Sequence, residues 1–173
     1  MAIAILSARV KMTQLCQADW PLFKALRLDS DVTALCFDTP TMAEIQMRFT
    51  ARLQPWHVDS PHWLCLTIQH RTSGQKLGVT GFCLQDGIAE VGYLLLPSSH
   101  GKGCATESLK ALLSWAISDL NIHHFRAVVT EGNEASAQVL LKNGFVLTRV
   151  IPDTYEIGGR LYADHIFTRG AGA

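Results

Sequence analysis

The sequence has no excess of charge of either sign and no long apolar run. Its 173 residues include 15 lysines and arginines and 15 aspartates and glutamates, so the formal net charge is zero. Nucleic-acid-binding domains usually present clustered positive charge, and we therefore predict no nucleic-acid partner. No stretch approaches the roughly 20 consecutive apolar residues that a membrane-spanning helix needs. The apolar segment 1–6 has no basic residue and is too short for a secretory signal, so we also predict no membrane association.

Cysteine pairs and metal-binding patterns are missing as well. The five cysteines form no C-x-x-C pair, and their odd number argues against a disulfide framework. A reducing, cytoplasmic location is the prediction that follows. The seven histidines show no H-E-x-x-H or other zinc spacing. The adjacent His123 and His124 would point to opposite faces of a strand, and we expect no bound metal.

The length of the chain suits one domain with a single sizeable core, and we treat residues 1–173 as one domain. Apolar periodicity predicts seven strands and four helices. The predicted strands are 8–15, 63–69, 77–84, 89–96, 124–130, 145–150 and 161–168. The predicted helices begin near Trp20, Thr41, Ala105 and Asn133. Asn133 is predicted to cap the last of them, and Gly144 is predicted to end it. Strands 63–69, 77–84 and 89–96 follow one another as a meander, with Asp86-Gly87 as the second turn. The fold class is therefore α/β (α+β), with a mixed, mostly antiparallel sheet that contains one βαβ crossover.

A glycine-containing loop joins the strand 89–96 to a helix. It reads His100-Gly101-Lys102-Gly103-Cys104-Ala105-Thr106-Glu107, and apolar residues then recur at helical spacing up to about Asn121. A helix N-terminus has unpaired backbone N–H groups and the positive end of the helix dipole, which together favour a phosphate-bearing ligand. The alternative is a tight turn that merely contains glycines.

Two common nucleotide-binding patterns do not fit this loop. A P-loop requires Gly-Lys-[Ser/Thr], but Lys102 precedes Gly103 and no hydroxyl residue follows it directly. A dinucleotide fingerprint requires a third glycine or an alanine where Thr106 stands. Neither class of nucleotide enzyme is therefore indicated.

The pattern [QR]-x-x-G-x-[GA] fits more closely, as His100-x-x-Gly103-x-Ala105. With Glu90-Val91-Gly92-Tyr93 upstream, Asn133-Glu134-Ala135-Ser136 downstream and then Leu140-Leu141-Lys142-Asn143-Gly144-Phe145, it resembles the GNAT acyl-CoA N-acetyltransferases. The branch it is similar to contains the ribosomal-protein N-terminal alanine and serine acetyltransferases. The resemblance is specific over about 89–145 and faint over the first sixty residues. His100 departs from it, because the family usually has Gln or Arg there.

The resemblance implies a GNAT-like fold with acetyl-CoA as the cosubstrate. Main-chain N–H groups of the loop would hold the pyrophosphate, and the backbone of the preceding strand would hold the pantetheine arm. The residues so implicated are Leu94, Leu95, Leu96, His100, Gly101, Lys102, Gly103, Cys104, Ala105, Thr106, Asn133 and Ser136. Segment 89–145 would be the acetyl-CoA-binding core, and segment 1–60 would shape the acceptor side.

Two residues are candidates for moving protons. Glu90 lies on the strand before the loop, and partial burial among Val91 and Tyr93 would raise its pKa toward the range of a general base. A purely structural carboxylate is the alternative. Glu156 is a competing base, with Tyr155 beside it to orient substrate.

Ser136 is the candidate for protonating the leaving thiolate. Many family members carry a tyrosine seven residues after the asparagine, where this chain has Leu140, whereas the closer branch has a serine three residues after it, as Ser136 is here. A helix-start serine without a chemical role is the alternative. Cys104 sits in the loop without a His-Asp arrangement, so direct transfer is favoured over an acyl-enzyme.

The function predicted from the sequence is transfer of an acetyl group from acetyl-CoA to a primary amine in a ternary complex. A protein N-terminal α-amine is one candidate acceptor, and a small-molecule amine is the other. The alternative from another class is a catalytically silent acyl-CoA-binding or regulatory module. The sequence indicates nothing about oligomeric state.

Overall fold

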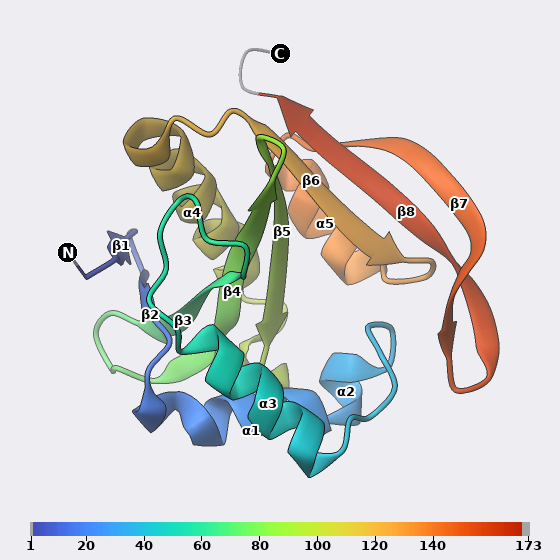
Figure 1. Cartoon of the computed structure of the whole chain (residues 1–173), viewed down its shortest axis with the longest axis horizontal. Coiled ribbons are helices and arrows are strands. Elements are labelled where there is room, and N and C mark those ends of the chain that lie inside the picture. Colours follow the sequence, from blue (N-terminus) through green and yellow to red (C-terminus); the bar gives the residue numbers. More distant parts are fainter. Residues whose placement is uncertain (1, 171–173) are drawn as a thin grey trace.

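The computed structural model describes residues 2–170, which form one eight-stranded sheet with five α-helices around it (Figure 1). The strands are β1 (Ala4–Leu6), β2 (Val10–Gln14), β3 (Leu64–His70), β4 (Lys76–Gln85), β5 (Ile88–Leu95), β6 (His124–Thr130), β7 (Val146–Ile157) and β8 (Arg160–Gly170). The helices are α1 (Trp20–Leu28), α2 (Ser30–Thr33), α3 (Met42–Arg52), α4 (Cys104–Leu120) and α5 (Glu134–Lys142). Short 3-10 turns precede α1 at Gln17–Asp19 and follow β5 at Pro97–Ser99.

The strand order is β1-β2-β3-β4-β5-β6-β8-β7, and every neighbouring pair is antiparallel except β5 and β6. The predicted class is confirmed: a mixed, mostly antiparallel sheet in which α4 makes the crossover between two parallel strands. The predicted meander is confirmed as β3, β4 and β5. The sequence-based counts were one strand and one helix short, because β1 has three residues and α2 has four. Segments that short show no measurable periodicity.

Helices cover the two faces of the sheet in separate sets. On one face, α4 packs Leu109, Leu112 and Leu113 onto β-strand residues such as Phe82 and Phe125, all nearly fully buried. On the other face, α1 and α3 form a smaller core, which contains Phe23, Leu26, Ile45, Phe49 and Val79. The apolar residues of α1 and α3 recur three or four apart, so each helix turns one stripe toward the sheet.

The ends of the helices follow from local chemistry. Thr41 and Glu44 form a capping box at the start of α3, in which the Thr41 backbone N–H donates to Glu44 Oε2 at 2.7 Å. The residue that caps the N-terminus of α4 is Gly103, at φ +76°, and the residue that caps its C-terminus is Asn121, at φ +56°. Gly144, at φ +79°, ends α5 as predicted. No helix within residues 2–170 is long and apolar enough to cross a membrane.

Candidate functional site

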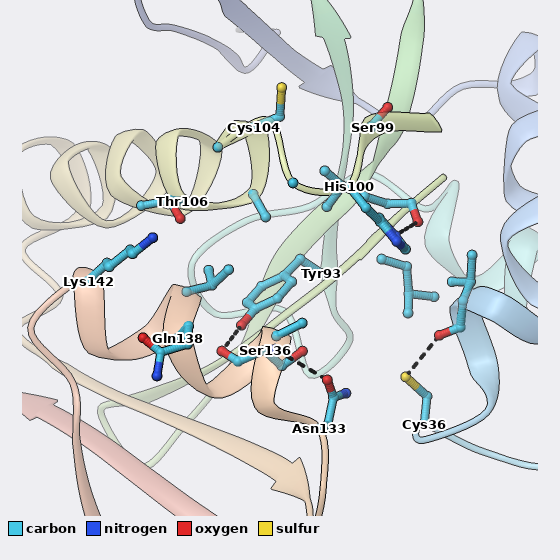
Figure 2. A pocket seen from close by; sticks show the side chains of 18 of the residues that line it. Cys36, Tyr93, Ser99, His100, Cys104, Thr106, Asn133, Ser136, Gln138 and Lys142 are labelled. Carbon is cyan, nitrogen blue, oxygen red and sulfur yellow. Dashed lines mark hydrogen bonds between the residues drawn. The ribbon is translucent and has the colours of Figure 1, made fainter. Parts of the chain in front are cut away.

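The parallel pair β5 and β6 separates after a short contact. Only Ile88, Ala89 and Glu90 of β5 pair with β6, and beyond them the two strands diverge (Figure 1). A cleft of about 430 Å³ lies alongside Tyr93, Leu94 and Leu95, the part of β5 that pairs with β4 but not with β6. Its other walls are the loop 99–106, the exposed face of α5 and one end of α2 (Figure 2). This volume falls within the range of small-molecule sites.

The glycine loop forms one end of the cleft. Gly101 and Gly103 both have left-handed φ values, +70° and +76°, a conformation that glycine adopts without strain. The first intrahelical bond of α4 is donated by Glu107 to the Gly103 carbonyl. The N–H groups of the residues before Glu107 therefore have no acceptor within the helix. A Cβ at Gly101 would meet nothing within 4 Å, so the backbone is open to an approaching phosphate group.

An ion-pair network anchors the loop from outside the cleft. Glu107 accepts hydrogen bonds from Ser7 Oγ at 2.7 Å, from the Arg9 backbone N–H at 2.7 Å and from Arg9 Nε at 2.6 Å. Arg9 Nη1 also donates to the Lys102 carbonyl at 2.9 Å. Burial alone would raise the pKa of Glu107, but the hydrogen bonds from Ser7 and Arg9 outweigh it and lower that pKa to about 2. The carboxylate thus stays charged and ties the turn between β1 and β2 to the start of α4, while Arg9 reaches on to the loop.

The backbone of β5 offers hydrogen-bonding groups to the cleft at alternate residues. The Leu96 N–H donates to the Leu77 carbonyl at 2.8 Å, and the Gly92 carbonyl accepts from Thr80 Oγ1. Because direction alternates along an antiparallel strand, Leu94 and Leu96 turn their polar groups toward β4, whereas Tyr93 and Leu95 turn theirs toward the gap. The Leu95 carbonyl accepts a 2.8 Å bond from His100 Nε2. Of the three leucines predicted to bind pantetheine through the backbone, only Leu95 has groups directed toward the gap.

The start of α5 forms the wall opposite β5. Asn133 is the N-cap of this helix, and its Oδ1 accepts a 3.2 Å hydrogen bond from the Ser136 N–H. The Tyr93 hydroxyl crosses the cleft and donates to the Ser136 carbonyl at 2.9 Å (Figure 2). Burial raises the pKa of Tyr93, so its hydroxyl stays protonated and keeps this contact. Leu140 of the same helix is fully buried.

Ten of the twelve residues predicted to bind the cosubstrate line this cleft, and Leu96 and Lys102 do not. Cys104 borders the cleft, but its side chain is 6% exposed and its sulfur points away from Ser136 (Figure 2). The sulfur of Cys104 is therefore not directed toward the start of α5, and direct transfer stays a prediction. No cluster of three or more metal-ligating side chains occurs within the described chain.

Glu90 lies outside the cleft, on the face of the sheet that α1 and α3 cover. Its Oε2 accepts hydrogen bonds from Arg126 Nε at 3.0 Å and from Arg126 Nη2. The predicted apolar surroundings are wrong, because Val91 and Tyr93 point to the opposite face of the strand. The side chain is 31% exposed and pairs with a cation instead. Its role as a base stays a prediction, as does that of Glu156, which is exposed on β7.

Sequence reasoning missed several residues of the site. Asn143 is 8% exposed, and its Nδ2 donates to the Thr106 carbonyl at 3.2 Å and to the Val139 carbonyl at 2.9 Å. It therefore fixes the end of α5 against the first turn of α4. Asp31 and Val32 reach the cleft from α2, a helix that no pattern predicted. The only signal for Asn143 was the motif Leu140–Phe145.

Comparison with known proteins agrees with this geometry. A family model described as an acetyltransferase (GNAT) domain matches residues 9–146, a span that contains the loop, the gap and α5. The chain belongs to the GNAT acetyltransferase family. Its predicted family and fold are thereby confirmed.

The curated relatives are matched only in part. An uncharacterized N-acetyltransferase, YoaA of Bacillus subtilis (strain 168), is 30% identical over 104 residues, which cover 58% of this chain and 59% of that protein. A second, p20 of Bacillus licheniformis, is 29% identical over 101 residues, or 57% of each chain. This chain thus spans less than two thirds of the curated relatives that it matches.

Solved structures show the same fold at low identity. RimL, a ribosomal L7/L12 alpha-N-protein acetyltransferase solved in complex with coenzyme A, superposes with a TM-score of 0.84 at 19% identity, covering 98% of both chains. A spermidine N-acetyltransferase from Vibrio cholerae, solved with CoA and spermine, has a TM-score of 0.79 at 16% identity, covering 94% of this chain and 95% of its own. One fold therefore serves a protein and a polyamine acceptor in these two structures.

Proposed function

We propose that this protein transfers the acetyl group of acetyl-CoA to a primary amine in a ternary complex. The observation that carries the proposal is the gap between β5 and β6, with the N-terminus of α4 at one end and the N-terminus of α5 along its side. Such a gap leaves a strand edge free for an extended ligand, and the end of α4 suits its phosphates. The residues present thus fit acetyl-CoA.

Each part of the site has a role in the proposed reaction. Backbone N–H groups at Gly103 to Thr106 hold the pyrophosphate, and the polar backbone groups of Tyr93 and Leu95 hold the pantetheine arm. Acetyl-CoA supplies an electrophilic thioester carbonyl and a thiolate leaving group. In the balanced reaction an N–C bond forms, the C–S bond breaks, and one amine proton is given up while the thiolate gains one.

Two side chains are proposed to move these protons. Glu90 accepts the amine proton, directly or through water, and Ser136 gives a proton to the thiolate. Ser136 lies in the cleft beside the Tyr93 hydroxyl, whereas Glu90 lies on the other face of the same strand. This division suits an acceptor that approaches from the α1 and α3 side, where segment 1–60 lies. A protein N-terminal α-amine and a small amine are both candidates.

Acetyl-CoA binding is tested by Ala105→Glu, with Ala105→Gln as the matched control. Ala105 lies in the first turn of α4 and lines the cleft. The helix dipole stabilises an acidic residue at this end of a helix, so the fold should be retained. The negative charge of the glutamate would, however, repel a phosphate bound at the same end. Calorimetry should show acetyl-CoA affinity reduced roughly 10–100-fold by Glu and little changed by Gln. Equal affinity of the two variants would refute binding of the phosphates at this helix.

Transfer is tested by incubating the protein with acetyl-CoA and a panel of amines and peptides. Release of free CoA thiol, with mass spectrometry of the products, identifies the acceptor. Tight acetyl-CoA binding without acetylation of any amine in the panel would favour the silent acyl-CoA-binding module instead.

A further inference from the structure

A second, smaller hollow lies on the opposite face of β5. Its volume is about 140 Å³, and it is bounded by β3, β4, β5, α1 and α3. Gly92 of β5 and its cross-strand partner Gly81 of β4 carry no side chains. The Trp63 ring packs against Gly92, 3.3 Å from where a Cβ on that residue would stand, and a Cβ on Gly81 would collide with the Leu64 carbonyl of β3. Trp63 and the backbone of β3 thus take up the room next to these glycines and form part of the wall of the hollow.

Two arginines line this hollow. Arg27 of α1 is only 8% exposed, and its guanidinium lies 3.4 Å from the centre of the Phe23 ring. Its Nη1 donates to the Phe23 carbonyl at 3.3 Å, but its Nε has no hydrogen-bond partner in the described structure. Arg52 of α3 stands 5.0 Å from the centre of the Trp63 ring. No carboxylate within residues 2–170 forms a salt bridge with either arginine.

A buried cation without a counter-ion is costly to the fold. Burial, with smaller contributions from the neighbouring Arg52 and Arg48, lowers the pKa of Arg27 to about 10, although Cys65 acts in the opposite direction. A buried guanidinium N–H without a hydrogen-bond partner calls for an explanation. An anion supplied by a ligand would satisfy the Nε group and offset the repulsion between the arginines.

We propose that this hollow binds a carboxylate carried by the acceptor amine. The proposal rests on the acetyl-transfer function above and adds the substrate class to it. The hollow and the cleft share Tyr93 and Leu94 as lining residues, so the two sites meet across β5. The side chains of Glu90, Gly92 and Leu94 face the same side of the sheet, which places the proposed base on the face that holds the hollow.

The chemistry of the hollow selects among amines. Arginine presents a planar fork of N–H donors that matches a carboxylate, and the hollow is too small for a bulky anion with a large substituent. The two arginines would repel a polyamine such as the spermine bound in the structure from Vibrio cholerae. The expected acceptor is an amino acid, or a peptide whose acidic group lies close to its amine.

The test compares amino acids with their carboxamides, together with spermine, by calorimetry on the protein with and without saturating CoA. Measurement below neutrality keeps both amines of each pair protonated, so only the carboxylate differs. At least one amino acid should bind about tenfold or more tightly than its carboxamide, as expected for charge-assisted hydrogen bonds. Binding of every amino acid no tighter than its carboxamide would overturn the proposal.

Variants test whether the carboxylate preference arises from this hollow. Arg52→Met should abolish the preference for the amino acid over its carboxamide, and Arg52→Glu should make spermine bind more tightly than the amino acid. Arg48→Met is the matched control, because Arg48 lies one turn earlier on α3, is exposed, and does not line the hollow. A carboxylate preference that survives Arg52→Met would place the anion elsewhere and overturn the assignment. Arg27→Met should also abolish the preference if circular dichroism shows that this variant folds.

An assay of the CoA thiol released from acetyl-CoA in the presence of the same amines separates the two proposals. A carboxylate preference in binding without any acetyl transfer would refute the catalytic function and leave the anion pocket standing. Acetylation of amino acids and their carboxamides with equal efficiency would support the catalytic function and refute the anion pocket.

Discussion

Glu107 should contribute to stability and to acetyl-CoA binding through one network. Replacing it by Gln puts an amide where the carboxylate accepts hydrogen bonds from Ser7 and Arg9. The amide has one acceptor oxygen, and its NH₂ group meets N–H and O–H donors that it cannot accept from. Arg9 then loses the partner that holds it against the Lys102 carbonyl. The substitution should therefore loosen both the start of α4 and the glycine loop.

The magnitude follows from the pKa of Glu107. Its value is about 2, against an ordinary 4.5, and each unit corresponds to about 1.4 kcal/mol, so the upper limit is about 3 kcal/mol. Arg9 is 49% exposed, and solvent screens such a pair, so we expect about 1–2 kcal/mol. For a chain of this size that amounts to a fall in Tm of roughly 3–6 °C.

The sign of the pH dependence is fixed by the direction of the shift. A carboxylate whose folded pKa is lowered contributes stability that is fully present above the unfolded pKa, near 4.5, and that is lost as the pH falls toward 2. Wild type and Glu107→Gln should therefore differ most near neutrality, and the difference should shrink as the pH falls below about 4.5. Urea unfolding at several pH values measures this difference.

Glu134→Gln is the matched control for this experiment. Glu134 also lies in the first turn of a helix, α5, but it is exposed, so its substitution reports the helix-dipole contribution without the network. Equal destabilisation by the two substitutions, or a difference between wild type and Glu107→Gln that does not change with pH, would refute the reasoning. Acetyl-CoA affinity should fall in Glu107→Gln and stay unchanged in Glu134→Gln.

Two further substitutions test the proposed proton transfers. Ser136→Ala should lower kcat with little change in acetyl-CoA affinity, because the hydroxyl acts mainly as the thiolate develops; single-turnover rates check this, and an unchanged rate would leave Ser136 as a helix-start residue only. Glu90→Gln keeps the shape of the side chain but removes the base, so kcat should fall by roughly 10²–10⁴-fold and the acidic limb of the pH–rate profile should disappear. A variant that keeps its rate and its acidic limb would make Glu90 a structural partner of Arg126, with Glu156 the next residue to test.

Local patterns predicted the parts of the fold whose cause is local. The loop before α4 was found because two glycines and a helical run are adjacent in sequence, and Gly103 does adopt a left-handed φ. The meander was found because each of its strands is a short apolar run closed by a turn, such as Asp86-Gly87, where both residues have positive φ. Asn133 was predicted as a cap, and its side chain does accept a bond from the helix that it begins.

Contacts between distant segments could not be predicted in this way. Glu90 and Arg126 are 36 residues apart, and only the parallel register of β5 and β6 brings them together. The network of Glu107 joins segments 98 to 100 residues apart. No sequence pattern within β5 or β6 indicates that the two strands separate. The separation depends on the residue at which their pairing stops, and not on the residues that either strand contains.

The neighbours of β5 change along the strand, from β6 at its start to the gap and the hollow near its end. Where it pairs with β6, Glu90 is held by Arg126 on the face that α1 and α3 cover. Beyond that pairing, Tyr93 turns its hydroxyl to α5 on the other face, while Gly92, which has no side chain, lets the Trp63 ring pack against the strand beside the hollow. A ligand along the free edge of the strand and a ligand in the hollow would therefore approach the same short segment from different sides. Direct transfer needs two substrates bound at once and close together, and this segment of β5 is where such an arrangement can be built.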